Sequence, residues 1–254
     1  MTQSSILRSV QNGLKILQLF TLEKPTWGIT EMANALHLHK TTVSRLVGDL
    51  IAEGYLEKSE RKYRLGLSLL CLGGVITSHL EIYREAKDTL QELVQLLDET
   101  VHIAVLEETN IIYLHKVECK QPVHLLSYIG RKNPAVCTSS GKAILAYSPE
   151  SLVQRVIDAG FPQMGPNSIQ NKERLLEDLG AVKKDGYSIC ISELHEGIVS
   201  IAAPVRDYTE EVIAAISVVG PIERITEGNM KQIANSIKKA AHHISTNLGY
   251  FQHY

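Results

Sequence analysis

The sequence is poor in the features that mark unusual protein classes. Of its 254 residues, 6% are aromatic and only eight are proline, while 44% are hydrophobic. This composition excludes a disordered, collagen-like or low-complexity chain. The longest stretch without a charged residue, 65–80, has 16 residues and contains an adjacent glycine pair. A bilayer span requires roughly 20 apolar residues, so we expect no membrane helix.

Cysteine is also scarce, with four residues that lie far apart: Cys71, Cys119, Cys137 and Cys190. No pair has C-x-x-C spacing, and neither the cysteines nor the ten histidines show zinc-ligand spacing. We therefore expect reduced thiols and no disulfide framework, structural metal or cofactor. The first residues carry no basic segment before an apolar run, which predicts no secretory signal and a cytoplasmic location.

Charge is nearly balanced overall but not along the chain. The net charge is −2, yet residues 1–75 hold nine Lys or Arg against six Asp or Glu. The first 75 residues therefore carry +3 and the remainder −5. A basic bias of this size is weak evidence alone, but it points to a nucleic-acid partner for the N-terminal part.

The N-terminal part has the apolar spacing of three helices. The first covers 6–20, where apolar residues recur at three- and four-residue steps. A short second helix has Thr30 as its expected N-cap and ends near His37. The third covers 40–52 and is stopped by Gly54. Two short helices joined by a three-residue turn are typical of a helix-turn-helix.

Two strand-like runs follow, at 55–58 and 62–65, separated by a charged turn. A helix-turn-helix followed by a basic hairpin indicates a winged helix. Residues 67–79 are apolar on nearly every side, so a helix in this range must be shielded from water by another part of the structure. Packing against a second subunit is the simplest way to do so.

The rest of the chain mixes helix-like and strand-like patterns. We expect helices at 82–97, 139–147, 149–159, 172–185 and 228–248, and strands at 101–106, 111–117, 123–129, 187–191, 198–205 and 212–219. Helices grouped before, within and after an apparently antiparallel sheet indicate an α+β domain.

Short sequence blocks follow one another along the whole chain in a characteristic order. They are ITEMA at 29–33, KTTVSRL at 40–46, GYL at 54–56, YRLG at 63–66, SGKA at 140–143 and APV at 203–205. With these blocks the chain resembles the IclR family of bacterial transcription regulators. The resemblance runs from about Leu7 to Gly249, so it is specific at the level of the whole chain.

The resemblance implies an N-terminal winged helix-turn-helix at 1–66, a linker helix at 67–81, and a GAF-like effector-binding domain at 82–254. It also implies a homodimer or homotetramer that binds a palindromic operator in double-stranded DNA. A small metabolite, often a carboxylate, is expected to set the affinity for DNA.

Candidate DNA contacts lie at the polar start of the third helix and on the hairpin. In a helix-turn-helix the start of the second helix meets base edges, and hairpin cations neutralise phosphates. The planar guanidinium of Arg45 suits guanine O6 and N7, so it is the strongest candidate for base recognition. We predict DNA contacts by Lys40, Thr41, Thr42, Ser44, Arg45, Arg61, Lys62 and Arg64.

A second group of polar residues, 138–142, begins a helix after a bend. Exposed N–H groups at a helix start favour an anion, although a plain N-cap needs only one of the hydroxyls. By the resemblance, the effector pocket is lined by Leu125, Asn133, Ser139, Ser140, Cys190, Ser200, Ser217 and Val219.

Two positions depart from the family pattern. Cys190 stands where many relatives carry Asp, and Val219 where a well-known relative carries serine. The loss of two polar groups predicts a pocket less polar than that of a glyoxylate or pyruvate sensor. A larger or more apolar effector, such as a sugar acid or an aromatic acid, is therefore a hypothesis.

Two other functions fit parts of the sequence. Residues 139–142 match the Ser-x-x-Lys pattern of acylating enzymes, but the Lys-Thr-Gly motif that accompanies it is missing, and the sequence has no G-x-S-x-G elbow either. Cys137 and Cys190 allow a thiol-based GAF-type redox sensor, yet neither has an adjacent basic residue to stabilise a thiolate. We therefore expect a transcription regulator that is not an enzyme, acting as repressor or activator.

Overall fold

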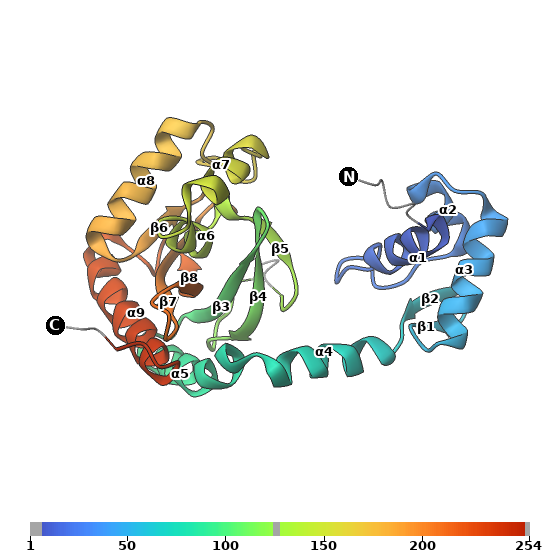
Figure 1. The fold of residues 1–254 in the computed structure, drawn as a ribbon, viewed down its shortest axis with the longest axis horizontal. Coiled ribbons are helices and arrows are strands. Elements are labelled where there is room, and N and C mark those ends of the chain that lie inside the picture. The colour runs from blue at the N-terminus through green and yellow to red at the C-terminus, as the bar shows by residue number, and fades with distance from the viewer. Residues whose placement is uncertain (1–6, 124–127, 252–254) are drawn as a thin grey trace. The chain divides into compact units, whose positions relative to one another are not determined.

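The computed structural model describes residues 7–123 and 128–251. The chain divides into two compact units, Met1–His79 and Leu80–Tyr254, each with its own hydrophobic core. Figure 1 shows the course of the chain through both units. In the described ranges, no helix is both long and apolar enough to cross a membrane.

The N-terminal unit is a winged helix-turn-helix followed by one further helix. Its elements are α1 (Arg8–Gln18), α2 (Ile29–Leu36), α3 (Lys40–Ala52), β1 (Leu56–Ser59), β2 (Lys62–Leu65) and α4 (Ser68–His79). The buried core side chains are at most 7% exposed: Ile16, Met32, Ala33, Val43, Leu46, Val47 and Leu56. Trp27, which precedes α2, pairs its backbone with Tyr63 of β2, so the hairpin is attached to the helices.

The start of α2 differs from the prediction. Its N-cap is Gly28 rather than Thr30, and the helix begins two residues earlier than a Thr30 cap requires. The reason is Glu31, whose Oε2 accepts the backbone N–H of Gly28 at 2.8 Å. The Glu31 carboxylate in the first helical turn thus satisfies the backbone N–H of the N-cap residue Gly28, which has no acceptor within the helix.

The C-terminal unit is built on a six-stranded antiparallel sheet with strand order β5-β4-β3-β8-β7-β6. The strands are β3 (Thr100–Glu107), β4 (Asn110–Val117), β5 (Lys132–Pro134), β6 (Ser188–Ile191), β7 (Ile198–Arg206) and β8 (Val212–Pro221). Because side chains alternate along a strand, the sheet presents two different faces to the helices.

Helices cover both faces of this sheet (Figure 1). The long helices α5 (Glu81–Leu97) and α9 (Glu227–Asn247) bury one face through alternating Val and Ile side chains of the strands. The short helix α6 (Ser139–Leu145) packs on the other face, next to the 3-10 turn Ala135–Cys137. A cluster of buried residues joins that turn and α6 to α7 (Glu150–Asp158) and α8 (Lys172–Asp185).

The strand predicted at 123–129 is wrong at its described positions. Val123, Tyr128 and Ile129 lie outside every strand, while residues 124–127 are outside the described part of the chain. The edge strand β5 forms instead, by pairing with 110–112 of β4. Three residues that end in proline carry no alternating pattern, so this strand depends on its partner rather than on its own sequence.

Candidate functional site

The polar face of α3 is separate from the face that enters the core. Of the predicted DNA contacts on this helix, Thr42 is half-buried and the other four are exposed. Residues such as Val43 and Leu46 are buried on the opposite side. The exposed residues therefore form one continuous polar surface over the first turns of α3: Lys40, Thr41, Ser44 and Arg45.

The start of α3 is capped by a histidine. His39 Nδ1 lies 2.7 Å from the Thr41 hydroxyl and accepts the Thr41 backbone N–H at 3.4 Å. Both side chains are exposed. The Thr41 hydroxyl is thus held in place at the point where a recognition helix meets DNA.

The cations of the wing, β1 and β2 with their turn, differ in their surroundings. Arg64 donates two hydrogen bonds to Glu57 Oε2, at 2.9 and 3.1 Å, and Lys62 Nζ lies 3.2 Å from Glu31 Oε1. Arg61, in the turn, makes no ion pair within the described residues. These three cations and Lys58 of β1 are exposed, and of the four only Lys58 and Arg61 form no ion pair with a carboxylate of the described residues.

The second candidate site is a small cavity in the C-terminal unit, between the sheet and the start of α6. Its volume is ≈ 30 Å³, enough for about one or two water molecules. Six of the predicted effector residues line it: Ser139, Ser140, Cys190, Ser200, Ser217 and Val219.

Strand register explains why the residues from the sheet meet in one place. Cys190, Ser200 and Val219 lie side by side across β6, β7 and β8. Ser217 is two residues from Val219, so its side chain points to the same face. That face is the one toward α6, where the cavity lies.

The two remaining predicted effector residues are Leu125 and Asn133. Leu125 lies outside the described residues. Asn133 does not line the cavity; it is buried on β5, where its Oδ1 accepts a hydrogen bond from Arg131 Nε at 3.3 Å. Burial raises the pKa of Tyr113, a residue of the cavity wall, to about 12. The phenol therefore keeps its proton at neutral pH.

Seven further residues line the cavity but were not among the predicted effector residues: Tyr113, Cys137, Thr138, Glu193, Leu194, His195 and Ile198. Of these, Thr138 belongs to the polar helix start, 138–142, that was predicted to favour an anion. Several belong to the connection between β6 and β7, and connections at strand ends often carry binding residues. Their place in the sequence, directly after a predicted strand, was the feature that could have identified these residues. With Glu193, His195 and Tyr113 in its wall, the cavity is more polar than the predicted residues alone indicated.

The start of α6 leaves its serine hydroxyls free for a ligand. Thr138 is the N-cap, and its Oγ1 accepts the backbone N–H of Gly141 at 3.0 Å. Ser139 and Ser140 are each 2% exposed, and their hydroxyls bond to no described residue. A Cβ at position 141 would clash with the Ala135 carbonyl, so glycine permits the close approach that shapes this wall.

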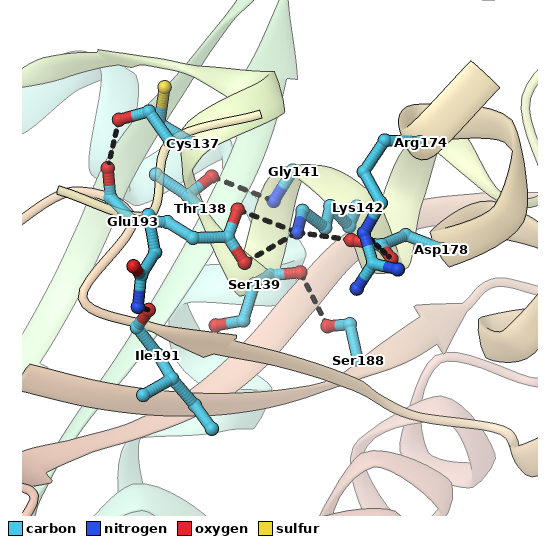
Figure 2. Close-up of polar contacts among 12 residues, drawn as sticks. Cys137, Thr138, Ser139, Gly141, Lys142, Arg174, Asp178, Ser188, Ile191 and Glu193 are labelled. Carbon is cyan, nitrogen blue, oxygen red and sulfur yellow. Dashed lines mark hydrogen bonds and ion pairs between the residues drawn. The ribbon is translucent and has the colours of Figure 1, made fainter. Parts of the chain in front are cut away.

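Behind the cavity, the buried side chain of Lys142 lies between two carboxylates (Figure 2). Its Nζ is 2.6 Å from Asp178 Oδ2 and 2.7 Å from both carboxylate oxygens of Glu193. Desolvation alone lowers the pKa of Lys142, but the ion pairs with Glu193 and Asp178 outweigh it and raise that pKa. The ammonium stays protonated, which is unsuitable for the base of a Ser-x-x-Lys enzyme.

The two cysteines of the cavity are poor nucleophiles. Burial raises the pKa of the Cys137 thiol to about 11, and it raises the pKa of the Cys190 thiol well above its ordinary value. A thiol sensor requires a thiolate at neutral pH.

The described residues contain no group of three or more His, Cys, Asp or Glu that is arranged to hold a metal ion.

Two protein-family models match the chain. The IclR helix-turn-helix domain matches residues 9–60, and the C-terminal domain of bacterial transcriptional regulator IclR matches residues 75–246. The chain belongs to the IclR family.

Relatives and solved structures agree with this family. The HTH-type transcriptional regulator KipR of Bacillus subtilis is 31% identical, over 96% of this chain and 98% of its own length. KdgR of Dickeya chrysanthemi is 33% identical, over 98% of this chain and 82% of its own length. The crystal structure of Thermotoga maritima IclR covers 96% of this chain and 100% of its own, with TM-score 0.79 and 25% identity.

An IclR homolog from Microbacterium hydrocarbonoxydans, solved in complex with 4-hydroxybenzoate, shares the fold with TM-score 0.84 and 24% identity, over 94% of this chain and 98% of its own. The two family models together show that the present chain is a DNA-binding transcription regulator with mixed α+β architecture. The predicted family and fold class are confirmed, and the named relatives are transcriptional regulators.

Proposed function

We propose that this regulator binds a two-fold operator through α3 and the wing, and that a small carboxylate metabolite in the cavity sets its affinity for DNA. The observation that carries this proposal is that Ser139, Ser140 and Ser217, each residue 2% exposed, line one cavity with hydroxyls that bond to no described residue. Each hydroxyl can donate one hydrogen bond and accept others, so together they can bind the polar groups of a small ligand. A cytoplasmic location suits the DNA partner.

We further propose that α1 and α4 hold two copies of the chain together. The apolar side chains of α4 are exposed, with Leu70 at 72% and Ile76 at 61%. A groove of ≈ 540 Å³ is lined by side chains of α1, α3 and the start of α4, among them Leu14 and Leu72. Exposed apolar surface of this kind favours an interface, and sedimentation of the full chain measures whether one forms.

In this proposal residues 67–81 link a DNA-binding domain, 1–66, to an effector domain, 82–254. An effector that changes the spacing of two winged domains changes their fit to an operator with two half-sites. A coupling free energy of about 1–3 kcal/mol is enough, because it alters DNA affinity roughly 5–150-fold.

The test is selection of bound fragments from genomic DNA by the purified chain, followed by titration of a selected fragment. We expect saturable binding that prefers the selected fragment over random DNA of equal length. The affinity should change when the small-molecule fraction of a bacterial extract is added. A chain that binds all fragments equally in both conditions refutes the proposal.

A further inference from the structure

The proposed effector cavity is rich in hydroxyls but has no lysine or arginine among its described lining residues. Its one histidine, His195, is half-buried, and burial together with the charge of Arg131 lowers the pKa of His195. The imidazole is therefore neutral at neutral pH. A ligand in this cavity is selected by hydrogen bonds rather than by a full positive charge.

Glu193 is the acidic side chain of the cavity wall, and its position is fixed from two sides. Its carbonyl oxygen accepts hydrogen bonds from Ser168 Oγ at 2.6 Å and from the Gly165 N–H at 2.9 Å. Its carboxylate is held by Lys142, as Figure 2 shows. The group cannot swing away from the cavity without breaking a buried ion pair.

The Glu193 carboxylate keeps capacity to accept further hydrogen bonds. A carboxylate has about four acceptor positions, whereas the three protons of Lys142 are shared between Glu193 and Asp178. The buried Oε2 atom makes no hydrogen bond with described residues beyond its ion pair with Lys142. Glu193, which carries this acceptor, lines the same cavity as Ser139, Ser140 and Ser217, whose hydroxyls bond to no described residue.

We propose that Glu193 determines effector specificity by accepting a hydrogen bond from an effector hydroxyl, and that the effector is a small hydroxylated acid. The inference rests on the proposed function of the cavity. A ligand hydroxyl donates to Glu193 and accepts from a serine at the same time. An alkyl, aromatic or simple oxo acid lacks the donor and leaves the carboxylate desolvated without a partner. Sites built to bond a hydroxyl strongly reject analogues that lack it.

The test compares ligands that are matched in carbon number. Binding of glycerate and propionate to the full chain is measured by calorimetry, and so is binding of gluconate and hexanoate, because ligand entry often rearranges a pocket. We expect the hydroxylated member of at least one pair to bind about tenfold or more tightly than its partner. In Glu193→Gln that preference should fall to within about threefold.

Asp178→Asn is the matched control, because it changes a second carboxylate on the same lysine to an amide outside the cavity lining. A purely structural role for Glu193 predicts equal effects of both variants on the preference, and this result overturns the inference. Should Glu193→Gln not fold, Ser217→Ala replaces it and should also reduce the preference.

Equal or tighter binding of propionate and hexanoate, or no binding by any of the four acids, also overturns the inference. Glycerol, which has hydroxyls but no carboxylate, tests the hydroxyl contact separately from the proposed binding of a carboxylate. Tighter binding of glycerol than of glycerate supports the hydrogen bond to Glu193 but contradicts the claim that the effector is an acid. Failure to bind operator DNA, with the hydroxyl preference intact, refutes only the regulatory proposal.

Discussion

The two candidate sites place polar groups in opposite surroundings. On α3 and the wing, Arg45 and Arg61 are exposed, whereas Ser140 and Ser217 in the cavity are 2% exposed. Exposed charges are screened by salt and contribute little to stability. Buried polar groups are costly unless paired, and they act as a network. Substitutions on the DNA face should therefore spare folding, whereas substitutions behind the cavity should disturb folding and ligand binding together.

The largest effect should come from Lys142→Met. Removing the ammonium leaves the buried carboxylate of Glu193 without a counter-charge and Asp178 with only its ion pair to Arg174, which costs about 3–5 kcal/mol of unfolding free energy. Urea unfolding of the full chain measures this loss of free energy from the unfolding transition of the C-terminal unit. Lys183→Met is the control, because this lysine is exposed on α8 and should change stability by less than about 0.5 kcal/mol. A loss below about 1 kcal/mol in Lys142→Met contradicts the buried network.

The next effect is a pH dependence that His102 causes. This residue is fully buried against the Tyr113 ring, with centroids 4.8 Å apart, and burial, aided by the charge of Lys116, lowers its pKa to about 3. In the unfolded chain His102 takes up a proton as the pH falls through about 6.5, whereas in the native state it stays neutral until about pH 3. The contribution of His102 to the free energy of unfolding is therefore complete above pH 6.5 and is lost as the pH falls toward 3.

At pH 5 the wild type should have lost about 2 kcal/mol through His102 relative to neutral pH. His102→Phe keeps a ring against Tyr113 and should show a correspondingly flatter decline in unfolding free energy. The exposed residue His242 is the comparison: His242→Ala should keep the wild-type decline. Parallel profiles for wild type and His102→Phe would rule out this role.

Arg45→Ala should abolish most of the preference for operator over random DNA, about 1–3 kcal/mol, without altering thermal stability. Arg45→Lys sharpens the test, because it keeps the charge but loses the planar two-donor geometry. It should retain affinity for random DNA and lose the preference. Competition binding measures both quantities, and undiminished preference in Arg45→Ala means that the base contact is assigned wrongly.

The smallest effect distinguishes the wing cations from one another. Arg61→Ala should reduce the slope of log affinity against log salt by about 1, because an unpaired cation releases a counterion on contact with phosphate. Arg64→Ala should reduce it less, since Glu57 already neutralises Arg64. Titrations at several salt concentrations provide the slopes. Equal reductions would show that the ion pair opens when DNA binds.

Local patterns predicted the elements whose ends are set by their own residues. Helix α8 covers 172–185 as expected, because Asn171 caps its start and Gly186, at φ 78°, ends it. Strand β5 was missed, since its pairing with β4 decides it. The N-cap of α2 was misplaced, because the role of Glu31 depends on reciprocal contacts with Gly28.

The candidate site was predictable only in part, for the same reason. Resemblance supplied the serines of α6, β7 and β8 and also Cys190, all of which line the cavity. It did not supply Tyr113, Glu193 or His195, whose presence in the wall depends on strand register and on the connection after β6. The pairing of Lys142 with Asp178 and Glu193, 36 and 51 positions away, is likewise a tertiary feature.

The central claim is that a buried cavity governs an exposed DNA surface. Its most direct test is the operator affinity of the full chain, with and without the small-molecule fraction of a bacterial extract. The account predicts a change of about fivefold or more in the wild type. It predicts no change in Ser217→Leu, whose larger side chain occupies the cavity, while Ser151→Leu on the exposed face of α7 keeps the response. An operator affinity that is identical in both conditions for the wild type contradicts the account.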